Sequence, residues 1–456
     1  MGFLFIAGTV AGCAVLSAEE QSPTPERRPA PKPRGLPVKV VVFDGDLKRG
    51  VPNAAVSIGR QRLHTDRRGV AATRLVPGPA LVSVRKPGYS PASRRYHFRR
   101  FSTFTFRVYQ PRLQWTMYGA DPARTGVHPG VRLRPPFRIV WSIAHDDLIE
   151  FPAVVSDGFA YIANGRGTVQ AFSMRHGTLA WRRNTHTIMA SSLAIWRDKL
   201  VVHGMGDGRV RVLDRKNGRV LWSRRIGSAI ESSPVVRYDV DYFGTRDGRV
   251  VALNLHTRRV RWVHYSGAKI TASISLAGRT AYFGNYGGRV TALDTRTGRV
   301  RWSNGVNGRV YGTAPVDGGR LFVPSSTGGS VTAFSTRGTR IWSFYTGSYV
   351  YSSPVTWAGR VVFGSYNGVL YGLAARTGGV LWTVPIGGSI SGAPVIVDGV
   401  AYAASFGNRT IGVDVKTGRV IFRFPHGQYV PVSGNGSRLL LHGYSRIWAV
   451  EPRRRR

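Results

Sequence analysis

The sequence has a single cysteine, few acidic residues and few lysines. Its 456 residues include 23 Asp and Glu against 65 Lys and Arg, a formal net charge of +42. With Cys13 alone, no intrachain disulfide and no paired-cysteine site can form. Arginine makes up most of the basic count and is spread through many turns, with one short run at 453–456. We interpret most of the charge as compositional and keep a polyanion-binding surface as an alternative, with no specific nucleic-acid partner.

The common catalytic signatures are also missing. The sequence contains no phosphate-binding P-loop, no HExxH zinc motif and no GxSxG nucleophile motif. The glycine-rich stretch at 204–208 resembles a turn between strands. His64 and His97 are expected at the surface, not as metal ligands. The one acidic cluster, HDDLIE at 145–150, is a candidate contact site without an evident mechanism.

The only long apolar run lies at the N-terminus. Residues 1–20 carry no charge before Glu19, and VAGC at 10–13 fits the lipobox of secreted bacterial lipoproteins, which makes Cys13 the lipidation candidate. No basic residue precedes the run, so an uncleaved membrane anchor is the alternative. Residues 21–35 are Pro-rich and predict an extended spacer. We therefore expect an extracytoplasmic protein anchored to the cell membrane, at the cell surface or in the periplasm.

Residues 36–110 show short alternating runs separated by Gly, Pro and Asp, which predicts a small β domain. In TDRRG at 65–69, Asp66 and Gly69 suit a tight hairpin turn. The order VPNAAV, TDRRGVA, PGPALVSVRKPGY resembles the carboxypeptidase-regulatory-like, transthyretin-type β-sandwiches of exported bacterial proteins. That resemblance implies a spacer or adhesion module.

The rest of the chain, 111–456, repeats with a period near 40 residues. Each unit ends in an aromatic residue that we assign to packing between units: Trp141, Trp181, Trp222, Trp262, Trp302, Trp342, Trp382 and Phe422. Four strand-like runs fill each unit, as in SPVVRY, VDYFGT, RVVALNL and RVRWVHY, so each unit is predicted to be a propeller blade. One surplus strand at 137–143 precedes the first unit, and three unpaired runs follow Phe422.

The surplus strand is predicted to become the outer strand of the last blade. This closure removes a free sheet edge and gives an all-β, eight-bladed β-propeller, preceded by the β-sandwich; we expect a monomer. Within the repeated LDTRTGRVRW, Asp294 is predicted to bind backbone amides of the next turn and Gly298 to adopt a positive φ. The closing tryptophan is predicted to fill the seam between blades.

Units of the form SSPVV…YFGTRDGRVVALN…RVRW resemble the pyrroloquinoline-quinone (PQQ)-type repeats of bacterial propellers, and WTMYGADPARTG at 115–126 resembles the segment that leads into them. The resemblance implies one of two branches: quinoprotein dehydrogenases, or non-catalytic scaffolds such as outer-membrane assembly lipoproteins. The dehydrogenases use a vicinal cysteine pair, Ca²⁺ held by Glu, Asn and Asp, and long capping insertions. This sequence lacks the cysteines and the insertions, so PQQ and Ca²⁺ are disfavoured and no cofactor is expected.

One position just before the innermost strand of each blade is expected to face the channel mouth. The residues assigned to it are Glu150, Ser191, Glu231, Thr271, Gly312, Tyr351 and Ser391. Two acids among small polar and aromatic residues could bind a cation or an amine, or be solvated rim residues. The sequence thus favours a membrane-tethered, non-catalytic scaffold that binds a protein or a cell-envelope polymer, with a PQQ-dependent dehydrogenase and a polyanion-binding protein as alternatives.

Overall fold

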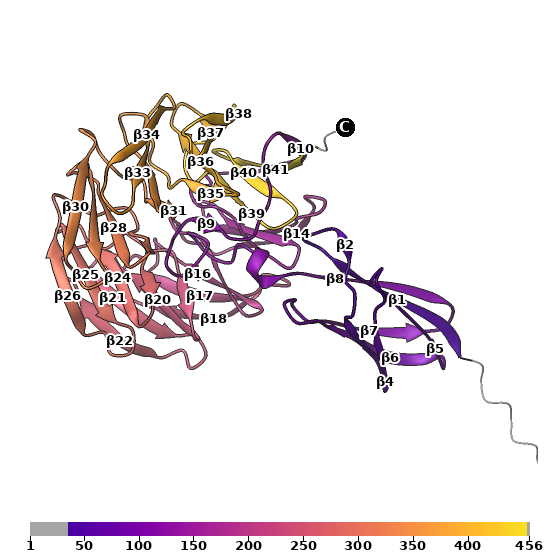
Figure 1. The fold of residues 1–456 in the computed structure, drawn as a ribbon. Coiled ribbons are helices and arrows are strands. Elements are labelled where there is room, and N and C mark those ends of the chain that lie inside the picture. Colours follow the sequence, from indigo (N-terminus) through magenta and orange to yellow (C-terminus); the bar gives the residue numbers. More distant parts are fainter. Residues whose placement is uncertain (1–34, 454–456) are drawn as a thin grey trace, which may run out of the picture.

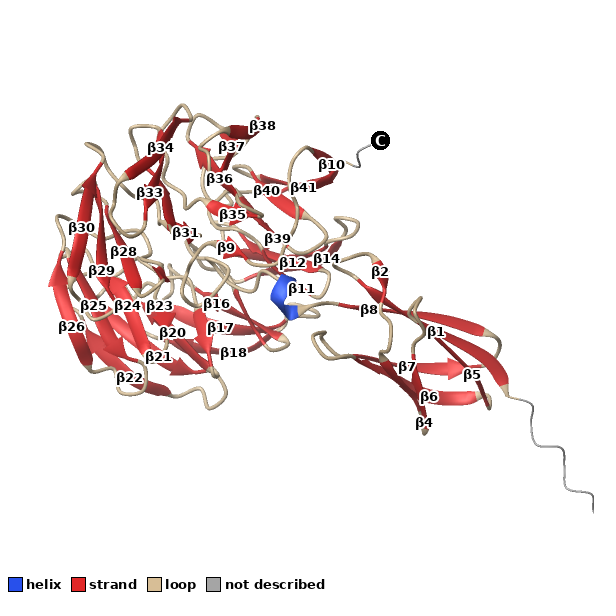
Figure 2. Ribbon diagram, viewed as in Figure 1, coloured by secondary structure: helices blue, strands red, loops and turns tan. Residues whose placement is uncertain are grey.

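A computed structural model describes residues 35–453 of the chain. These residues form a small two-sheet unit and a large ring of sheets, coloured from indigo to yellow along the chain in Figure 1. Figure 2 shows that strands dominate both parts; the one helix of the described region is a 3₁₀ turn, η1 (Pro111–Leu113), between them. The predicted all-β class is confirmed.

The N-terminal unit is a sandwich of two four-stranded sheets. One sheet has the order β2-β1-β5 with β8 on the other side of β1, and the other has the order β4-β3-β6-β7. Alternating valines and aromatics point inward from both sheets and form a core that includes Val40, Val56, Val82 and Phe106. The strands are β1 (Leu36–Asp44), β2 (Arg49–Gly50), β3 (Ala55–Ile58), β4 (Gln61–His64), β5 (Val70–Leu75), β6 (Gly78–Arg85), β7 (Ala92–Phe98) and β8 (Ser102–Val108).

Local predictions for this unit agree with the structure. Asp66 Oδ1 accepts the backbone N–H groups of Arg68 and Val70 at 2.8 and 2.9 Å, and Gly69 has φ +79°. His64 and His97 are exposed. Membership of the carboxypeptidase-regulatory-like family stays a prediction, as do the boundaries at 36–110 and 111–456.

The ring contains eight sheets within the described residues, each built on four antiparallel strands; the seventh gains β9 (Val127–His128) as a fifth strand, parallel to β35 on its inner side. The first seven run from the innermost to the outermost strand in chain order. They are β11 (Val154–Ser156), β12 (Phe159–Ala163), β13 (Thr168–Ser173), β14 (Leu179–Asn184); β15 (Ala194–Trp196), β16 (Lys199–His203), β17 (Arg209–Asp214), β18 (Val220–Arg225); β19 (Val235–Arg237), β20 (Val240–Gly244), β21 (Arg249–Asn254), β22 (Val260–Tyr265); β23 (Ser275–Ala277), β24 (Thr280–Gly284), β25 (Arg289–Asp294), β26 (Val300–Gly305); β27 (Val316–Asp317), β28 (Arg320–Ser325), β29 (Ser330–Ser335), β30 (Arg340–Tyr345); β31 (Val355–Trp357), β32 (Arg360–Gly364), β33 (Val369–Ala374), β34 (Val380–Pro385); β35 (Val395–Val397), β36 (Val400–Ser405), β37 (Arg409–Asp414) and β38 (Val420–Phe424).

The eighth sheet closes the ring with strands from both ends of the propeller sequence. Its order is β10 (Phe137–Ala144), β41 (Arg446–Pro452), β40 (Leu439–His442), β39 (Val432–Gly434). β10 pairs antiparallel with β41 from Phe137–Pro452 to Ala144–Arg446. The predicted closure by the strand at 137–143 is therefore confirmed: β41 is paired on both sides, and β10 takes the outermost place that β14 takes in the first blade.

The recurrent aromatic residue packs against the next blade, as predicted. The indole N–H of Trp262 donates to the Thr295 carbonyl of the following blade at 3.0 Å, and the equivalent bond recurs for Trp141, Trp181, Trp302, Trp342 and Trp382. Phe422 packs edge-on against Phe137 and Tyr402. Trp222 differs, because Arg258 takes the place of the glycine that faces the tryptophan in other blades, and its guanidinium lies 5.8 Å from the centre of the Trp222 ring.

The turn after Asp294 also has the predicted chemistry. Asp294 Oδ1 accepts the N–H groups of Arg296 and Thr297 at 2.9 and 3.1 Å, and Gly298 has φ +73°. A hydrogen bond from the Arg301 side chain to the other carboxylate oxygen is the main cause that holds the pKa of Asp294 below its usual range.

The segment 115–128, which we call the inner segment, threads the centre of the ring and contacts every blade. Backbone hydrogen bonds or bridges join it to the inner strands of six blades, at Val155, Ile195, Leu276, Val316, Thr356 and Ile396. Arg124 reaches the carbonyls of Ser233 and Pro234 in the third blade. His128 lies 3.2 Å from the carbonyl oxygen of Gly434 in the eighth. Its last residues form β9 (Val127–His128), parallel to β35.

The sandwich contacts the face of the ring that carries the β11–β12, β13–β14 and β39–β40 turns. Lys48 Nζ lies 2.6 Å from Glu451 Oε1, and Asp46 sits against Gly436. A groove of about 770 Å³ separates the two units there. Because successive turns of a meander alternate between faces, the β12–β13 type turns lie on the opposite face of the ring.

No helix among residues 35–453 is long and apolar enough to cross a membrane. The predicted lipobox with Cys13, the anchor alternative and nearly all of the Pro-rich spacer fall in residues 1–34, outside the described residues.

Candidate functional site

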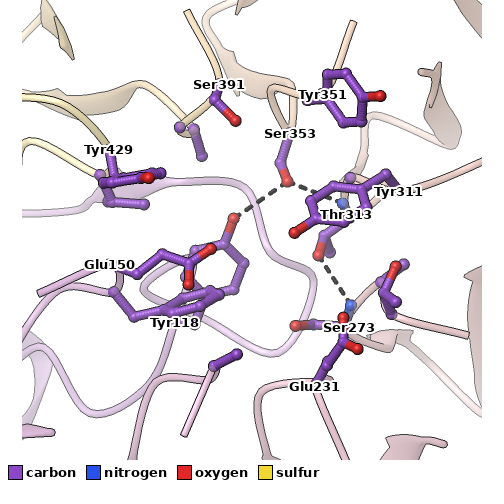
Figure 3. A pocket seen from close by; sticks show the side chains of 18 residues that line it. Tyr118, Glu150, Glu231, Ser273, Tyr311, Thr313, Tyr351, Ser353, Ser391 and Tyr429 are labelled. Atoms are coloured by element: carbon purple, nitrogen blue, oxygen red, sulfur yellow. Dashed lines mark hydrogen bonds between the residues drawn. The ribbon is translucent and has the colours of Figure 1, made fainter. Parts of the chain in front are cut away.

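The channel mouth is a small pit, and most of the predicted mouth residues line it. Figure 3 shows Glu150, Glu231, Tyr351 and Ser391 around one common space. Thr271 also lines it. The structure therefore brings together five of the six predicted site residues, from five different blades.

Two of the predicted mouth residues, Ser191 and Gly312, lie one residue beyond the position that faces the mouth. In the first seven blades the mouth position follows a buried apolar residue: Ile149, Met189, Ile230, Ile270, Val310, Val350 or Ile390. Counting from that residue places Ala190 at the mouth in the second blade; Ser191 is buried one residue further on and does not line the pit. The same count adds Tyr311 beside Gly312. Alignment on the apolar residue, which is visible in the sequence, would have found both.

The inner segment closes the bottom of the pit. The Tyr118 side chain is 7% exposed, and its hydroxyl donates to Ser353 Oγ at 3.1 Å. Sequence reasoning missed Tyr118 because its place depends on how the inner segment threads the ring, which no local pattern encodes.

Five hydroxyl side chains, one from each of five consecutive blades, form a hydrogen-bonded series around the bottom of the pit, which we call the ladder: Ser192, Ser233, Ser273, Thr313 and Ser353. In each step, the backbone N–H of one blade donates to the equivalent hydroxyl of the next blade. The bonds are Ser192 N to Ser233 Oγ (3.0 Å), Ser233 N to Ser273 Oγ (3.0 Å), Ser273 N to Thr313 Oγ1 (3.1 Å) and Thr313 N to Ser353 Oγ (2.8 Å). The ladder fixes the spacing of the mouth residues, since these lie two positions before the ladder residues.

The two acids of the pit differ in their surroundings. Glu231 Oε1 lies 3.0 Å from Arg246 Nε and 3.7 Å from Lys269 Nζ, so two cations balance its charge. No ion pair to Glu150 is found among the described residues. Burial, with a contribution from the Glu231 carboxylate, raises the pKa of Glu150. Glu150 thus has the chemistry of a desolvated carboxylate without a counter-ion.

Aromatic rings line the other side of the mouth in a continuous arc. Ring centroids of neighbours lie 4.9–6.4 Å apart along Tyr286, Tyr311, Tyr351, Tyr366, Phe406 and Tyr429. Tyr349 and Tyr444, about half exposed, lie at the outer rim. Burial raises the pKa of Tyr311, and the Glu150 and Glu231 carboxylates raise it further, so its hydroxyl stays a neutral donor.

The free space at the centre is small. The pit has a cavity volume of about 60 Å³, which is room for a few water molecules. Pockets for drug-sized ligands are roughly 300–1,000 Å³. Thr271 Oγ1 lines this space, 7% exposed as a residue, and has no hydrogen-bond partner among residues 35–453. The pit therefore suits one side-chain-sized polar group.

The residues present do not form the quinone and calcium site that the sequence resemblance implies. No group of three His, Cys, Asp or Glu converges anywhere in the part of the chain described. Ca²⁺ takes six to eight oxygen ligands, whereas the pit offers two carboxylates and no asparagine, with Glu231 already bound to two cations.

Comparison with known sequences identifies the repeats. The sequence profile of the outer membrane protein assembly factor BamB family matches residues 138–269, 246–354 and 328–446, which together cover more than half of the chain. The chain belongs to this family of PQQ-like β-propellers.

Solved structures agree with the fold. BamB from Moraxella catarrhalis is 20% identical, with 71% of this chain and 99% of that chain covered and a TM-score of 0.60. The quinohemoprotein alcohol dehydrogenase of Comamonas testosteroni is 14% identical over 75% of this chain and 81% of that chain, with a TM-score of 0.63. A europium-containing methanol dehydrogenase is 13% identical over 75% and 98% of the two chains, with a TM-score of 0.62. Likenesses at this identity establish the fold alone.

One curated relative shows a local match. The quinoprotein alcohol dehydrogenase PedE of Pseudomonas putida (strain KT2440) is 33% identical over 69 residues. The match covers 15% of this chain and 11% of that relative, so the chain spans about a tenth of the relative's length.

Proposed function

We propose that this protein is a non-catalytic binding scaffold of the cell envelope, held at the membrane by residues 1–20 and presenting the mouth face of its propeller to a protein or an envelope polymer. The observation that carries the proposal is the size of the pit: about 60 Å³ accommodates one side chain but no multi-ring cofactor. Half-exposed aromatic side chains around it, such as Tyr349 and Tyr444, provide an apolar rim of the kind that partners bury.

The arrangement of the two units supports this reading. The pit residues lie in the connections that lead into the innermost strands, such as Glu231 between β18 and β19, and these connections are on the face of the β12–β13 type turns. The sandwich contacts the other face, so it leaves the pit and its aromatic rim free. A BamB-like propeller also fits a partner-binding role in general.

Site-specific photo-cross-linking tests the proposal. A photoreactive residue at Tyr349, 51% exposed on the mouth face, should give a discrete adduct in cells that carry the full-length protein. The same probe at Tyr238, 85% exposed in the β19–β20 turn on the opposite face, should not. Absence of an adduct at Tyr349, or the same adduct from both positions, would count against the proposal.

A quinone-dependent dehydrogenase is the second candidate, favoured by the local match to PedE. It predicts dye reduction by the full chain with an alcohol when PQQ and Ca²⁺ are added. We expect no reduction above that of the cofactors alone, because the pit is too small and has too few ligands. Turnover that depends on the protein would reverse the assignment.

A polyanion-binding role is the third candidate, and the groove between sandwich and propeller is its best location. The groove is lined by the basic residues Lys48, Arg107, Arg138, Arg175 and Arg438, whereas its acids are Asp46 and Glu451. Binding of a polyphosphate there should weaken steeply with rising salt. Salt-insensitive binding, or none, would exclude this role.

A further inference from the structure

The pit at the channel mouth combines three features that a ligand would satisfy together. Glu150 is an uncompensated carboxylate, Thr271 Oγ1 is a buried oxygen without a partner, and tyrosine rings surround the remaining space. The Glu150 carboxylate needs hydrogen-bond donors, the Thr271 hydroxyl can accept from the same donor, and the rings present electron-rich faces.

A cation is the ligand that satisfies all three. An ammonium or guanidinium group donates several hydrogen bonds, neutralises a carboxylate and is attracted to aromatic faces. A neutral sugar could donate hydrogen bonds, but it would leave the charge of Glu150 unbalanced. A carboxylate or phosphate would be repelled.

The size of the cavity selects further among cations. About 60 Å³ accommodates the end of one slender side chain, and the floor formed by Tyr118 prevents the group from passing through the ring. The pit is therefore a blind pocket for a chain terminus or side-chain head, not a channel.

We infer that the pit binds the ammonium or guanidinium head of a lysine or arginine side chain from a partner protein, with Glu150 as its counter-ion. The inference rests on the proposed scaffold function and specifies the chemistry of the contact. Glu231 contributes less, because Arg246 and Lys269 already neutralise it. The aromatic arc would then pack against the apolar stem of the basic side chain and its neighbours.

Small probes test the inference on the full-length protein. n-Butylammonium and n-butylguanidinium, with n-butanol as the neutral match, are titrated and followed by saturation-transfer NMR. We expect saturable binding of one or both cations and at least roughly tenfold weaker binding of butanol. The difference between the two cations distinguishes a lysine from an arginine partner.

Matched variants test the role of Glu150. Glu150→Gln keeps the shape of the side chain and should weaken cation binding roughly tenfold or more. The control is Asp317→Asn, which makes the same charge change at an exposed acid at the end of β27 and should leave binding unchanged. Circular dichroism of each variant establishes that it is folded.

Each outcome has a defined meaning. Equal binding of butanol and the cations, preferential binding of a monosaccharide such as glucose, no saturation by either cation, or full binding in Glu150→Gln would overturn the inference. If cross-linking from Tyr349 still yields a partner in such a case, the scaffold proposal stands and only the cationic contact fails. If neither experiment gives a signal, both proposals fail.

Discussion

At the residue scale, six of the seven blade-closing tryptophans contact a glycine in a turn of the next blade, with Trp222 as the exception, and this contact explains why the repeat keeps both residues. A Cβ atom on Gly298 would lie 2.7 Å from the Trp262 ring, and Gly298 also needs φ +73°. A side chain there would displace the indole that fills the seam.

We predict that Gly298→Ala lowers the free energy of unfolding by about 2–4 kcal/mol, since it adds strain at positive φ to overpacking of a buried ring. Gly278→Ala is the control: Gly278 has φ +55° but open space around its Cβ position, so the cost is about 1 kcal/mol. Thermal unfolding of both variants measures the difference, and equal losses would refute the role of the tryptophan contact.

Asp46 is a second residue whose surroundings make a measurable prediction. It is 1% exposed at the junction of sandwich and propeller, where burial, opposed by hydrogen bonds from Gln110 and Gln114, raises its pKa to about 6. A raised pKa means that the folded protein holds the proton more tightly than the unfolded chain. Its contribution therefore favours the fold at low pH and is lost as pH rises from about 4 to about 6.

We predict that wild-type stability falls, relative to Asp46→Asn, by about 2–3 kcal/mol between pH 4 and pH 7. The variant removes the ionisable group and serves as the reference for all other titrations. Melting temperatures of the two proteins across this range give the result. A constant difference between them would show that Asp46 does not titrate there.

At the element scale, the inner segment depends on one buried arginine. Arg124 is 3% exposed, and its guanidinium donates to the carbonyls of Ile274, Ser233 and Pro234 at 2.9–3.1 Å. Burial lowers its pKa to about 10, which leaves it charged at neutral pH. Within residues 35–453, no backbone hydrogen bond joins the segment to the third blade, and the Arg124 side chain makes this connection instead.

Arg124→Met is predicted to destabilise the fold by about 3–5 kcal/mol, because carbonyl groups lose a charged donor in the interior. Amide hydrogen exchange should rise in residues 115–128 and at the inner strands of the third and fourth blades. Arg296→Met, at an exposed turn position, is the control and should change neither. Unaltered exchange in Arg124→Met would mean that the segment is held without it.

The elements also show what the sequence could and could not predict. The blades, their closure by β10 and the turn chemistry at Asp294 follow from short-range periodicity and were predictable. The placement of Ser191 failed because the interval between the tryptophans changes by one residue in that blade. Tyr118 and Arg124 could not be placed, since their roles come from contacts with residues more than a hundred positions away.

At the scale of the whole molecule, ring closure relies on β41. We predict that a chain truncated after Gly443 no longer forms a soluble monomer. Without β41, the edges of β10 and β40 are unpaired and free to associate with other molecules. Truncation after Arg453 keeps β41 and should behave as the full chain. Size-exclusion chromatography of both would decide, and a monomeric protein without β41 would disprove the closure argument.

The inner segment has contact positions that match the number of blades in the ring. Within 14 residues, 115–128, it makes contacts with all eight blades. Loss of one repeat would leave one contact position of the inner segment without a blade, and duplication of one repeat would leave one blade without a contact to the segment. The number of blades in this protein is thus specified both by the number of repeats and by the inner segment that precedes them.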